Sequence, residues 1–294
     1  MKIIQSFAQF EEGSPYLQHH NKPDYVYLSF YCFLLSQITV KKLYGDFTMF
    51  CNRKAYDSML RYIPYDNVQI MENHNKFKMW SMYKVDVMRI INDDFIHLDP
   101  DVSIFSKVLD PFINGECDVM VQDIVPFEDN RLKKFVFDNI DFFAETKILT
   151  KPFDGRAFSC GTVGIKKFAQ EYYFKGVEVL YEGMEKRGIE YIDYPTLILE
   201  EQLLYLIACE NFFSVQEIIP TELITEYGIM DGGDRIRYLH LWRAVKYKTH
   251  IIDMIRKKIF FDFPEYYDTV LKYEREVLSK FNFFPYFKLP MLYG

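Results

Sequence analysis

The alternation of strand-like apolar runs with stretches of helical periodicity is the feature that most constrains how this chain can fold. Up to residue 125, strands are expected at 2–7, 46–51, 67–71, 93–98 and 117–125, and helices at 25–44, 52–62 and 76–91. Strands that alternate with helices are typical of a parallel sheet covered by helices. The sequence therefore predicts an α/β protein with a mostly parallel central sheet flanked by helices.

The rest of the chain continues this pattern less regularly. We expect a helix at 131–145, a glycine-punctuated strand at 157–166, helices at 168–186 and 199–210, strands at 212–219 and 237–242, and a helix at 264–281. No stretch with the composition of a linker separates these elements. We therefore expect one domain over residues 1–294, ending in a helical, aromatic C-terminal tail at 251–294.

Composition and charge exclude several classes of protein. Hydrophobic residues are 49% of the 294 residues, which is enough for a buried core. The formal charge of -7, without a long basic run, predicts no nucleic-acid partner. The five cysteines are scattered, which favours reduced thiols over disulfides or a zinc site. No apolar run could span a bilayer and no signal-peptide pattern is present, so we expect a cytoplasmic protein without a transmembrane segment.

The stretch from residue 94 to 105, DFIHLDPDVSIF, carries the strongest chemical signal. In an extended chain alternate side chains share a face, so His97, Asp99, Asp101 and Ser103 are expected on one side. Pro100 keeps Asp99 out of the helical region and stiffens the acidic pair. Adjacent carboxylates repel each other unless a cation lies between them, and oxygen ligands favour Mg²⁺ or Mn²⁺. A plain Asp-Pro-Asp turn explains the same spacing, so both interpretations stay open.

A strand that ends in an Asp-x-Asp pair, after the order β-α-β-α-β and a helix like the one at 80–89, resembles the GT-A fold of nucleotide-sugar glycosyltransferases. Within that group, the chain is most similar to an uncharacterised bacterial glycosyltransferase-like family that opens with a MKIIQSF-type strand and carries a Leu-Asp-x-Asp-Val motif. The resemblance covers residues 1–246 and implies a GT-A-like, Rossmann-type sheet. It implies a nucleotide-sugar-binding half at 1–125 and an acceptor-side half at 126–250.

The same resemblance implies a metal site. Asp99 and Asp101 would hold Mn²⁺ or Mg²⁺ across the donor diphosphate. His240, in the segment YLHLW, stands where several GT-A families have the histidine that completes the metal shell, and Mn²⁺ accepts an imidazole nitrogen. Taken without the acidic pair, a lone histidine in an apolar strand is a hydrogen-bonded core residue.

Three cations are candidates for binding the donor. Lys84 shares a helical stripe with apolar residues, so it either extends to solvent or meets an anion. If the resemblance holds, Lys84 or Arg89 contacts the nucleotide or its phosphates, and Lys246, flanked by aromatic and basic residues, is the other candidate.

A glycine-containing segment, FSCGTVG at 158–164, stands where such families usually have Asn-Ala-Gly. Gly161 would let the backbone approach the donor sugar closely, which requires a small residue. Ser159 and Cys160 depart from the usual residues and put in doubt a sugar contact by an Asn side chain. Cys160 is interpreted as a buried, inert thiol, since no histidine lies near it in the sequence.

Two carboxylates are candidates for catalysis on the acceptor side. Glu201 begins a Glu-Gln pair that matches the acidic-Gln pair near the acceptor side of many such sites. Acidic residues in a first helical turn also interact favourably with the helix dipole, so a structural role for Glu201 stays equally open. Asp123 follows the strand VMVQ and is the second candidate, with a capping or loop role as the alternative.

Together these features predict a metal-dependent glycosyltransferase of hexosyltransferase type. It would move a sugar from a nucleotide-diphosphate-sugar donor, a UDP-sugar foremost, to the hydroxyl of a carbohydrate or glycolipid acceptor. One alternative is a catalytically inactive GT-A-like module that binds a sugar nucleotide or a protein, which the Ser159-Cys160 departure favours. The other is a metal-dependent hydrolase, although such enzymes need more ligands than this sequence offers.

Overall fold

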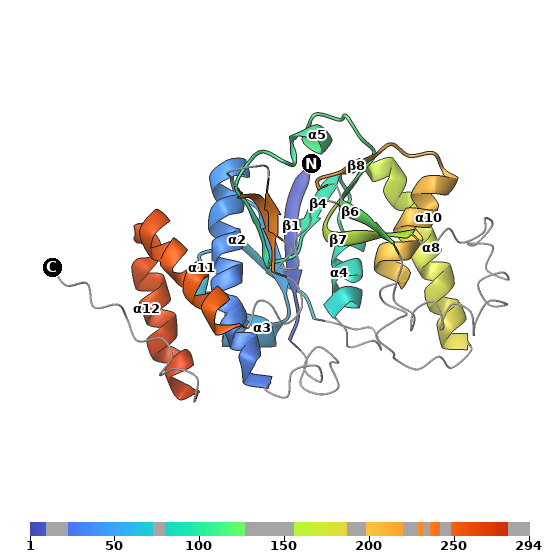
Figure 1. Ribbon diagram of the computed structural model, residues 1–294. Helices are drawn as coiled ribbons and strands as arrows, with labels where there is room; N and C mark the ends of the chain where they lie inside the picture. The colour runs from blue at the N-terminus through green and yellow to red at the C-terminus, as the bar shows by residue number, and fades with distance from the viewer. Residues whose placement is uncertain are drawn as a thin grey trace.

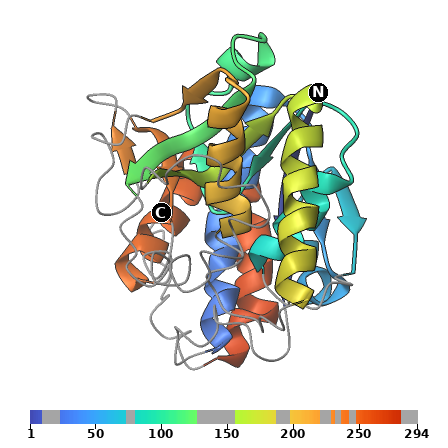
Figure 2. The ribbon, with the colours of Figure 1, turned by 90° about the vertical axis from the view of Figure 1, so that its right-hand side faces the viewer.

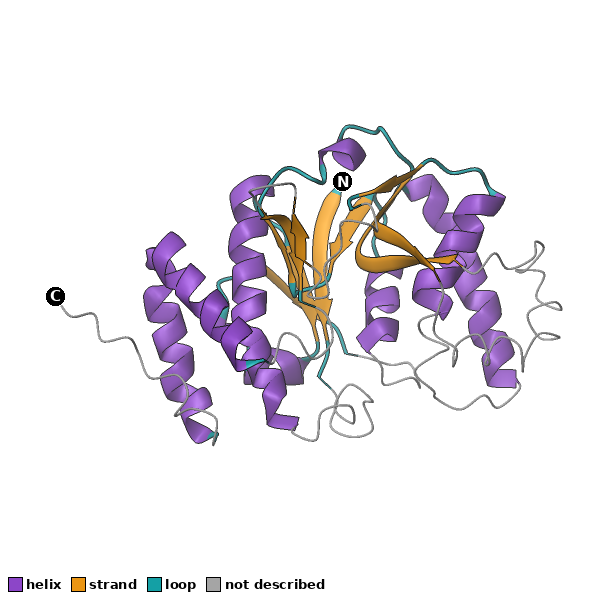
Figure 3. Cartoon of the chain, viewed as in Figure 1, coloured by secondary structure: helices purple, strands orange, loops and turns teal. Residues whose placement is uncertain are grey.

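A seven-stranded sheet forms the centre of the fold. The computed structural model describes residues 1–9, 23–72, 80–126, 156–186, 198–219, 229–231, 236–241 and 248–281. Within them the strands of the central sheet lie in the order β3-β2-β1-β4-β7-β6-β8, between helices on both sides (Figures 1 and 3). Their bounds are β1 (Lys2–Phe7), β2 (Thr48–Cys51), β3 (Asn67–Ile70), β4 (Phe95–Leu98), β6 (Val119–Pro126), β7 (Arg156–Ile165) and β8 (Val215–Glu217).

The sheet is mostly parallel, as the sequence predicted. Pairs β1–β2, β2–β3, β1–β4 and β6–β8 are parallel, and β7 runs antiparallel to both β4 and β6. The chain builds outward from β1 in two directions, first to β2 and β3 and then to β4. In open α/β sheets, ligands bind beyond the carboxyl ends of the strands at such a reversal. The residues that follow β1 and β4 therefore occupy the expected position of a ligand site.

A second, three-stranded antiparallel sheet lies beside the first. Its order is β5-β10-β9, with β5 at Val102–Ile104, β10 at Ile236–His240 and β9 at Ile229–Asp231. The prediction that 97–103 forms one extended face is wrong. The chain turns at Pro100 and Asp101, with the Val102 N–H donating to the Asp99 carbonyl at 2.9 Å. Pairing of β5 with β10 draws the chain out of the first sheet, so the segment contains a turn between two strands. The metal-site interpretation of the acidic pair stays a prediction.

Two groups of helices cover the sheet on opposite sides (Figure 1). On one side lie α2 (Ser29–Tyr44), α11 (Thr249–Asp262) and α12 (Tyr267–Glu276). On the other lie α4 (Trp80–Arg89), α8 (Lys167–Lys186) and α10 (Leu203–Glu210), with α8 and α10 side by side in Figure 2. The shorter elements are η1 (Pro23–Leu28), α3 (Arg53–Ser58), η2 (Leu60–Tyr62), α5 (Asp110–Ile113), the π-helical turn η3 (Ile198–Gln202), η6 (Pro264–Tyr266) and η7 (Leu278–Lys280).

Helix α2 is buried on every side from Ser29 to Val40. It has no polar face because the sheet lies on one side of it and α11 on the other. Its sheet side is fixed by a hydrogen bond from Gln5 Nε2 to Ser36 Oγ at 2.7 Å. The C-terminal helices are tied to the same core, since buried Arg256 of α11 pairs with Glu274 of α12 at 2.5 Å.

Most elements expected from periodicity are present with shifted ends. The strand expected at 212–219 is shorter, because Phe212 adopts a left-handed conformation with φ 56° before β8 begins. The tail expected at 251–294 is helical in its described part and packs on α2 and β2. The helix expected at 131–145 lies outside the described residues. The division into a 1–125 and a 126–250 half stays a prediction.

Candidate functional site

Three side chains that could bind a cation meet where the two sheets join. Asp99 is the first residue after β4, Asp101 precedes β5, and His240 ends β10. Main-chain hydrogen bonds fix both aspartates, since the Asp99 N–H donates to the Gly161 carbonyl at 2.8 Å and the Leu241 N–H donates to the Asp101 carbonyl at 3.3 Å. The turn and the pairing of β5 with β10 therefore bring together residues that lie far apart in the sequence.

The ligand atoms of this group lie close together. His240 Nε2 is 3.4 Å from Asp101 Oδ1 and 4.0 Å from Asp99 Oδ2, and one ligand atom from each of the three residues lies within 4.8 Å of the others. All three residues are buried. Burial raises the pKa of Asp99 above its ordinary value, and the neighbouring charge of Asp101 raises it further. Such a concentration of carboxylate is stabilised when a cation lies beside it.

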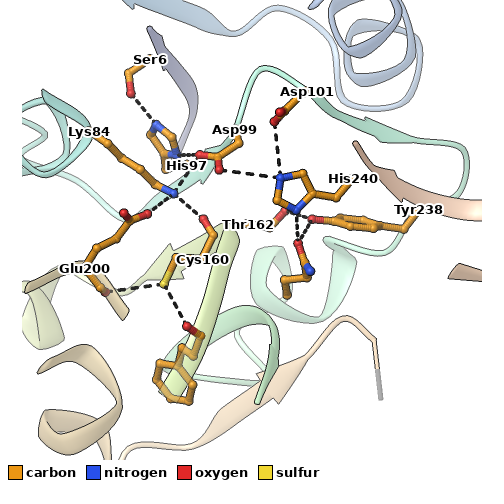
Figure 4. Close-up of polar contacts among 12 residues, drawn as sticks. Ser6, Lys84, His97, Asp99, Asp101, Cys160, Thr162, Glu200, Tyr238 and His240 are labelled. Atoms are coloured by element: carbon orange, nitrogen blue, oxygen red, sulfur yellow. Dashed lines mark hydrogen bonds and ion pairs between the residues drawn. The ribbon is translucent and has the colours of Figure 1, made fainter. Parts of the chain in front are cut away.

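Lys84 of α4 supplies one positive charge from inside the protein (Figure 4). Its Nζ lies 2.8 Å from Asp99 Oδ1 and 2.6 Å from Glu200 Oε1, and it also donates to the Cys160 carbonyl. Burial alone would lower the pKa of Lys84, but the carboxylates of Asp99 and Glu200 raise it above its ordinary value. Lys84 is therefore a buried ammonium ion that meets anions, one of the two alternatives that the sequence left open.

Glu200 is a site residue that the sequence analysis did not single out. It lies in the π-helical turn η3, is 2% exposed, and pairs with Lys84 through Oε1. Burial, opposed by Lys84, raises its pKa to about 7. Single π-helical turns occur frequently at functional sites. The signal in the sequence was the acidic doublet at 200–201, of which only the second residue was considered.

Asp123 and Glu201 lie near this group. Asp123 is fully buried, and the side chains of Ser159 and Gln122 interact with its carboxylate. Burial raises its pKa to about 6. Glu201 is half-buried beside Glu200, and burial followed by the charge of Glu200 raises its pKa well above the ordinary value. A carboxyl group with a raised pKa can exchange a proton near neutral pH.

Gly161 lies directly against His240. A Cβ atom at this position would be 2.4 Å from both Gln122 Oε1 and His240 Nδ1. The glycine is therefore required for the approach of two side chains of the site. The donor-binding role predicted for Gly161 stays a prediction.

A buried histidine, His97, lies next to Asp99 on the side of β1. His97 Nε2 lies 2.8 Å from Ser6 Oγ of β1, and its Nδ1 is 3.8 Å from Asp99 Oδ1 (Figure 4). Burial, and then the charge of Lys84, lowers the pKa of His97 well below its ordinary value, so the ring is neutral. The sequence predicted that His97 and Asp99 share a face, because they are two residues apart in an extended segment.

Arg89, a predicted donor ligand, lies away from this group. The structure does not bring Arg89 into the group: its side chain is half exposed at the end of α4 and pairs with Glu178 of α8. Its position in the last turn of α4 directs it to the helix surface, and the donor contact predicted for Arg89 stays a prediction. Lys246 lies outside the described residues. Cys160 is buried, and burial raises the pKa of its thiol well above the ordinary value, as expected of an inert thiol.

Fold and site define an α/β protein with a buried Asp-Asp-His group at the reversal point of its central sheet. The chain belongs to the family described as "Family of unknown function (DUF6734)", which it matches over residues 1–273. No curated protein sequence matches it. Among the described residues, no helix combines the length and apolar character that a membrane span requires.

Several solved structures share features of the fold. The galactosyltransferase LgtC, solved with donor and acceptor sugar analogues, is 14% identical with a TM-score of 0.37, over 69% of this chain and 71% of that one. Mouse xyloside xylosyltransferase 1 is 11% identical with a TM-score of 0.37, over 74% and 84% of the two chains. GlyE of Streptococcus pneumoniae is 10% identical with a TM-score of 0.37, over 88% and 62%. All three solved structures are described as glycosyltransferases.

Proposed function

We propose that this protein is a metal-dependent glycosyltransferase. It would move a sugar from a nucleotide-diphosphate-sugar donor, a UDP-sugar foremost, to the hydroxyl of a carbohydrate or glycolipid acceptor. The observation that supports this most directly is the buried Asp99-Asp101-His240 group at the carboxyl end of β4. In open α/β sheets this is the position where phosphate-containing ligands bind.

The donor set suits Mn²⁺ or Mg²⁺. Carboxylate oxygens are the ligands that both ions accept, and an imidazole nitrogen suits Mn²⁺ in particular. Asp99 Oδ1 is taken by Lys84, so Asp99 Oδ2, Asp101 and His240 Nε2 are the atoms that would hold the ion. A bound divalent ion supplies positive charge to the diphosphate leaving group.

Lys84 has a positioning role in this proposal instead of the donor contact first expected. An ammonium group has three N–H donors. In Lys84 these face three oxygens, those of Asp99, Glu200 and the Cys160 carbonyl. No N–H is left for a donor phosphate, so Lys84 holds Asp99 in place and offsets its charge.

Asp123 is the proposed general base. Its carboxylate, with a pKa raised to about 6, is ionised near neutral pH. The acceptor hydroxyl would give its proton to Asp123 while its oxygen bonds to the anomeric carbon of the sugar. The bond from that carbon to the diphosphate breaks, and the electron pair leaves with the diphosphate. Glu201, whose pKa is raised by burial and by the charge of Glu200, would hydrogen-bond the sugar or the acceptor.

The two alternative functions, an inactive binding module and a metal-dependent hydrolase, require different features of the site. The inactive-module interpretation drew on the Ser159-Cys160 departure. In the structure, Cys160 contacts Lys84 through its main-chain carbonyl, which any residue would provide. A two-metal hydrolase needs a second set of ligands. In the described part of the chain, Asp99, Asp101 and His240 are the one such group. Both facts favour the transferase.

Calorimetric titration of UDP and of GDP into the protein tests this function. Each nucleotide is titrated with Mn²⁺ and again with EDTA, using the native chain, Asp101→Asn, and Asp46→Asn as a control with an exposed aspartate far from the site in the sequence. Metal-dependent binding to the native chain and to Asp46→Asn, lost in Asp101→Asn, is the expected result. If neither UDP nor GDP binds the folded native protein, with or without metal, the proposal is overturned in favour of a non-catalytic binding protein.

A second measurement separates transfer from hydrolysis. The native chain is incubated with UDP-hexoses and Mn²⁺, with and without a panel of sugar acceptors, and UDP release is followed. Release that depends on the acceptor supports the transferase. Release at the same rate without acceptor would assign the protein to the hydrolases.

A further inference from the structure

We infer that Gln122 is a positioning residue that fixes the tautomer of His240. In this tautomer Nδ1 carries the proton, and Nε2, which faces Asp99 and Asp101, carries none. The consequence for metal affinity rests on the proposed function, whereas the tautomer itself does not. Gln122 lies in the middle of β6 and is 1% exposed. A buried glutamine side chain is costly unless its polar atoms form hydrogen bonds.

The hydrogen bonds around Gln122 form a short buried chain. His240 Nδ1 lies 2.7 Å from Gln122 Oε1, and the Tyr238 hydroxyl donates to the same Oε1 at 3.0 Å. Tyr238 OH in turn lies 2.9 Å from Thr162 Oγ1. These residues come from β6, β7 and β10, so the chain joins the central sheet to the second sheet (Figure 4).

The direction of these bonds follows from the chemistry of the groups. An amide oxygen accepts hydrogen bonds and cannot donate, so the ring nitrogen that faces it must carry a proton. His240 Nδ1 therefore donates to Gln122 Oε1. A neutral imidazole has one N–H, so the lone pair of the ring is on Nε2. Nε2 is the atom that lies 3.4 Å from Asp101 Oδ1 and 4.0 Å from Asp99 Oδ2.

A second hydrogen bond to Gln122 Oε1, from Tyr238, supports the same direction of donation. Tyr238 already donates its only hydroxyl proton to Gln122, so Thr162 is the donor in the bond between Thr162 and Tyr238. Thr162 and Tyr238 are fully buried. Thr162 therefore donates to Tyr238, and Tyr238 and His240 both donate to Gln122 Oε1.

Gly161 makes room for this contact. A Cβ atom there would lie 2.4 Å from each of the two atoms that form the bond, Gln122 Oε1 and His240 Nδ1. Neighbouring Thr162 provides the far end of the hydrogen-bond chain. The central residues of β7 therefore serve the orientation of His240 in two ways, by absence of a side chain and by a hydroxyl group.

The orientation of a ligating histidine by its other ring nitrogen affects metal affinity strongly. Removal of such a partner typically reduces affinity or activity by about 10- to 100-fold. We therefore expect Gln122→Leu, which has a similar volume and no acceptor, to bind Mn²⁺ about 10- to 100-fold more weakly than the native chain. Gln122→Glu keeps an acceptor oxygen and is the conservative variant that should restore the affinity in large part.

The test uses the full chain with ¹⁵N-labelled histidine. Long-range ¹H–¹⁵N NMR spectra are recorded in EDTA at mildly alkaline pH, and the His240 signals are identified by their loss in His240→Gln. The native chain and Gln122→Glu should show the proton on Nδ1, and folded Gln122→Leu should show a shift toward Nε2. A proton on Nε2 in the native chain would overturn the inference, and this outcome needs no variant to fold.

Manganese titration followed by electron paramagnetic resonance gives the second readout. Weaker binding in Gln122→Leu with recovery in Gln122→Glu supports the inference, and equal affinity together with an unchanged tautomer in Gln122→Leu contradicts it. If the native chain carries its proton on Nδ1 but binds no Mn²⁺, the positioning of His240 stands and the proposed metal-dependent function fails.

Discussion

The ammonium of Lys84 and the carboxylate of Glu200 form an ion pair of 2.6 Å in the interior of the protein, where the two side chains are 1% and 2% exposed. Lys84 belongs to α4 and Glu200 to the turn before α10, so the pair links two helical elements on the same side of the sheet. Asp99 shares the ammonium group, which places the pair directly behind the candidate ligands.

Loss of Lys84 should therefore destabilise the protein. In Lys84→Met, two carboxylates remain buried without their cation, and breaking a buried ion pair from one side costs about 3–5 kcal/mol. The free energy of unfolding from urea titration measures this. Lys84→Met combined with Glu200→Gln should recover part of the loss, because one uncompensated charge is removed. A double variant no more stable than Lys84→Met would contradict the charge-compensation role.

The pH dependence of stability should report on Asp123. Burial raises its folded-state pKa from an ordinary value of 3.8 to about 6, so the folded protein binds the proton more tightly than the unfolded chain does. The contribution of Asp123 to the free energy of unfolding is then most favourable at pH values below both pKa values. It falls by about 3 kcal/mol in total as the pH rises from about 4 to about 6. Asp123→Asn should lack this fall and should be the more stable protein above pH 6.

Urea unfolding across that pH range, in the presence of EDTA, gives the two stability curves. The difference between the native chain and Asp123→Asn isolates the contribution of Asp123 from that of other carboxylates. Asp46→Asn, on the protein surface, should leave the native curve unchanged. Under the proposed mechanism the more stable Asp123→Asn should also lose transfer activity, as expected when a buried group is kept for function. Parallel curves for the native chain and Asp123→Asn would refute the raised pKa.

Substitution of Gly161 should affect both stability and the metal site. The added methyl group of Gly161→Ala would lie 2.4 Å from Gln122 Oε1 and from His240 Nδ1, and overpacking of this kind costs about 1–3 kcal/mol. Gly176→Ala is the matched control, since its Cβ would meet the flexible end of Ile207 at 2.8 Å and alanine favours the helix. Thermal unfolding and Mn²⁺ titration of both variants should show losses only for Gly161→Ala.

Replacement of Phe212 by glycine should stabilise the protein. It has φ 56° in the turn after α10 and its side chain is 88% exposed. A left-handed conformation costs a residue with a side chain about 1–2 kcal/mol, and glycine is the usual residue at such a helix end. Phe212→Gly should therefore raise the free energy of unfolding by about 1 kcal/mol, less if the ring contributes contacts. Phe212→Ala keeps the strain and should stay close to the native value. Equal effects of the two substitutions would show that the backbone conformation is not the cause.

Local patterns in the sequence were sufficient to predict most elements of the fold. The runs that became β1, β2, β3, β4 and β6 and the helices between them are encoded by residues close together in the chain, and α/β alternation restricts how such elements can pair. The acidic pair of Asp99 and Asp101 was visible for the same reason, since its members are separated by one proline.

The contacts that make these residues a site were decided by tertiary structure. Lys84 shared a helical stripe with apolar residues, and only the packing of α4 showed that its ammonium faces Asp99 and Glu200. Gln122 and His240 are polar residues of separate strands, and their contact depends on the position of β10 in a second sheet. Periodicity along a chain indicates which face of an element is buried, but the partner across that face is set by strand order and register, which arise from contacts between distant segments.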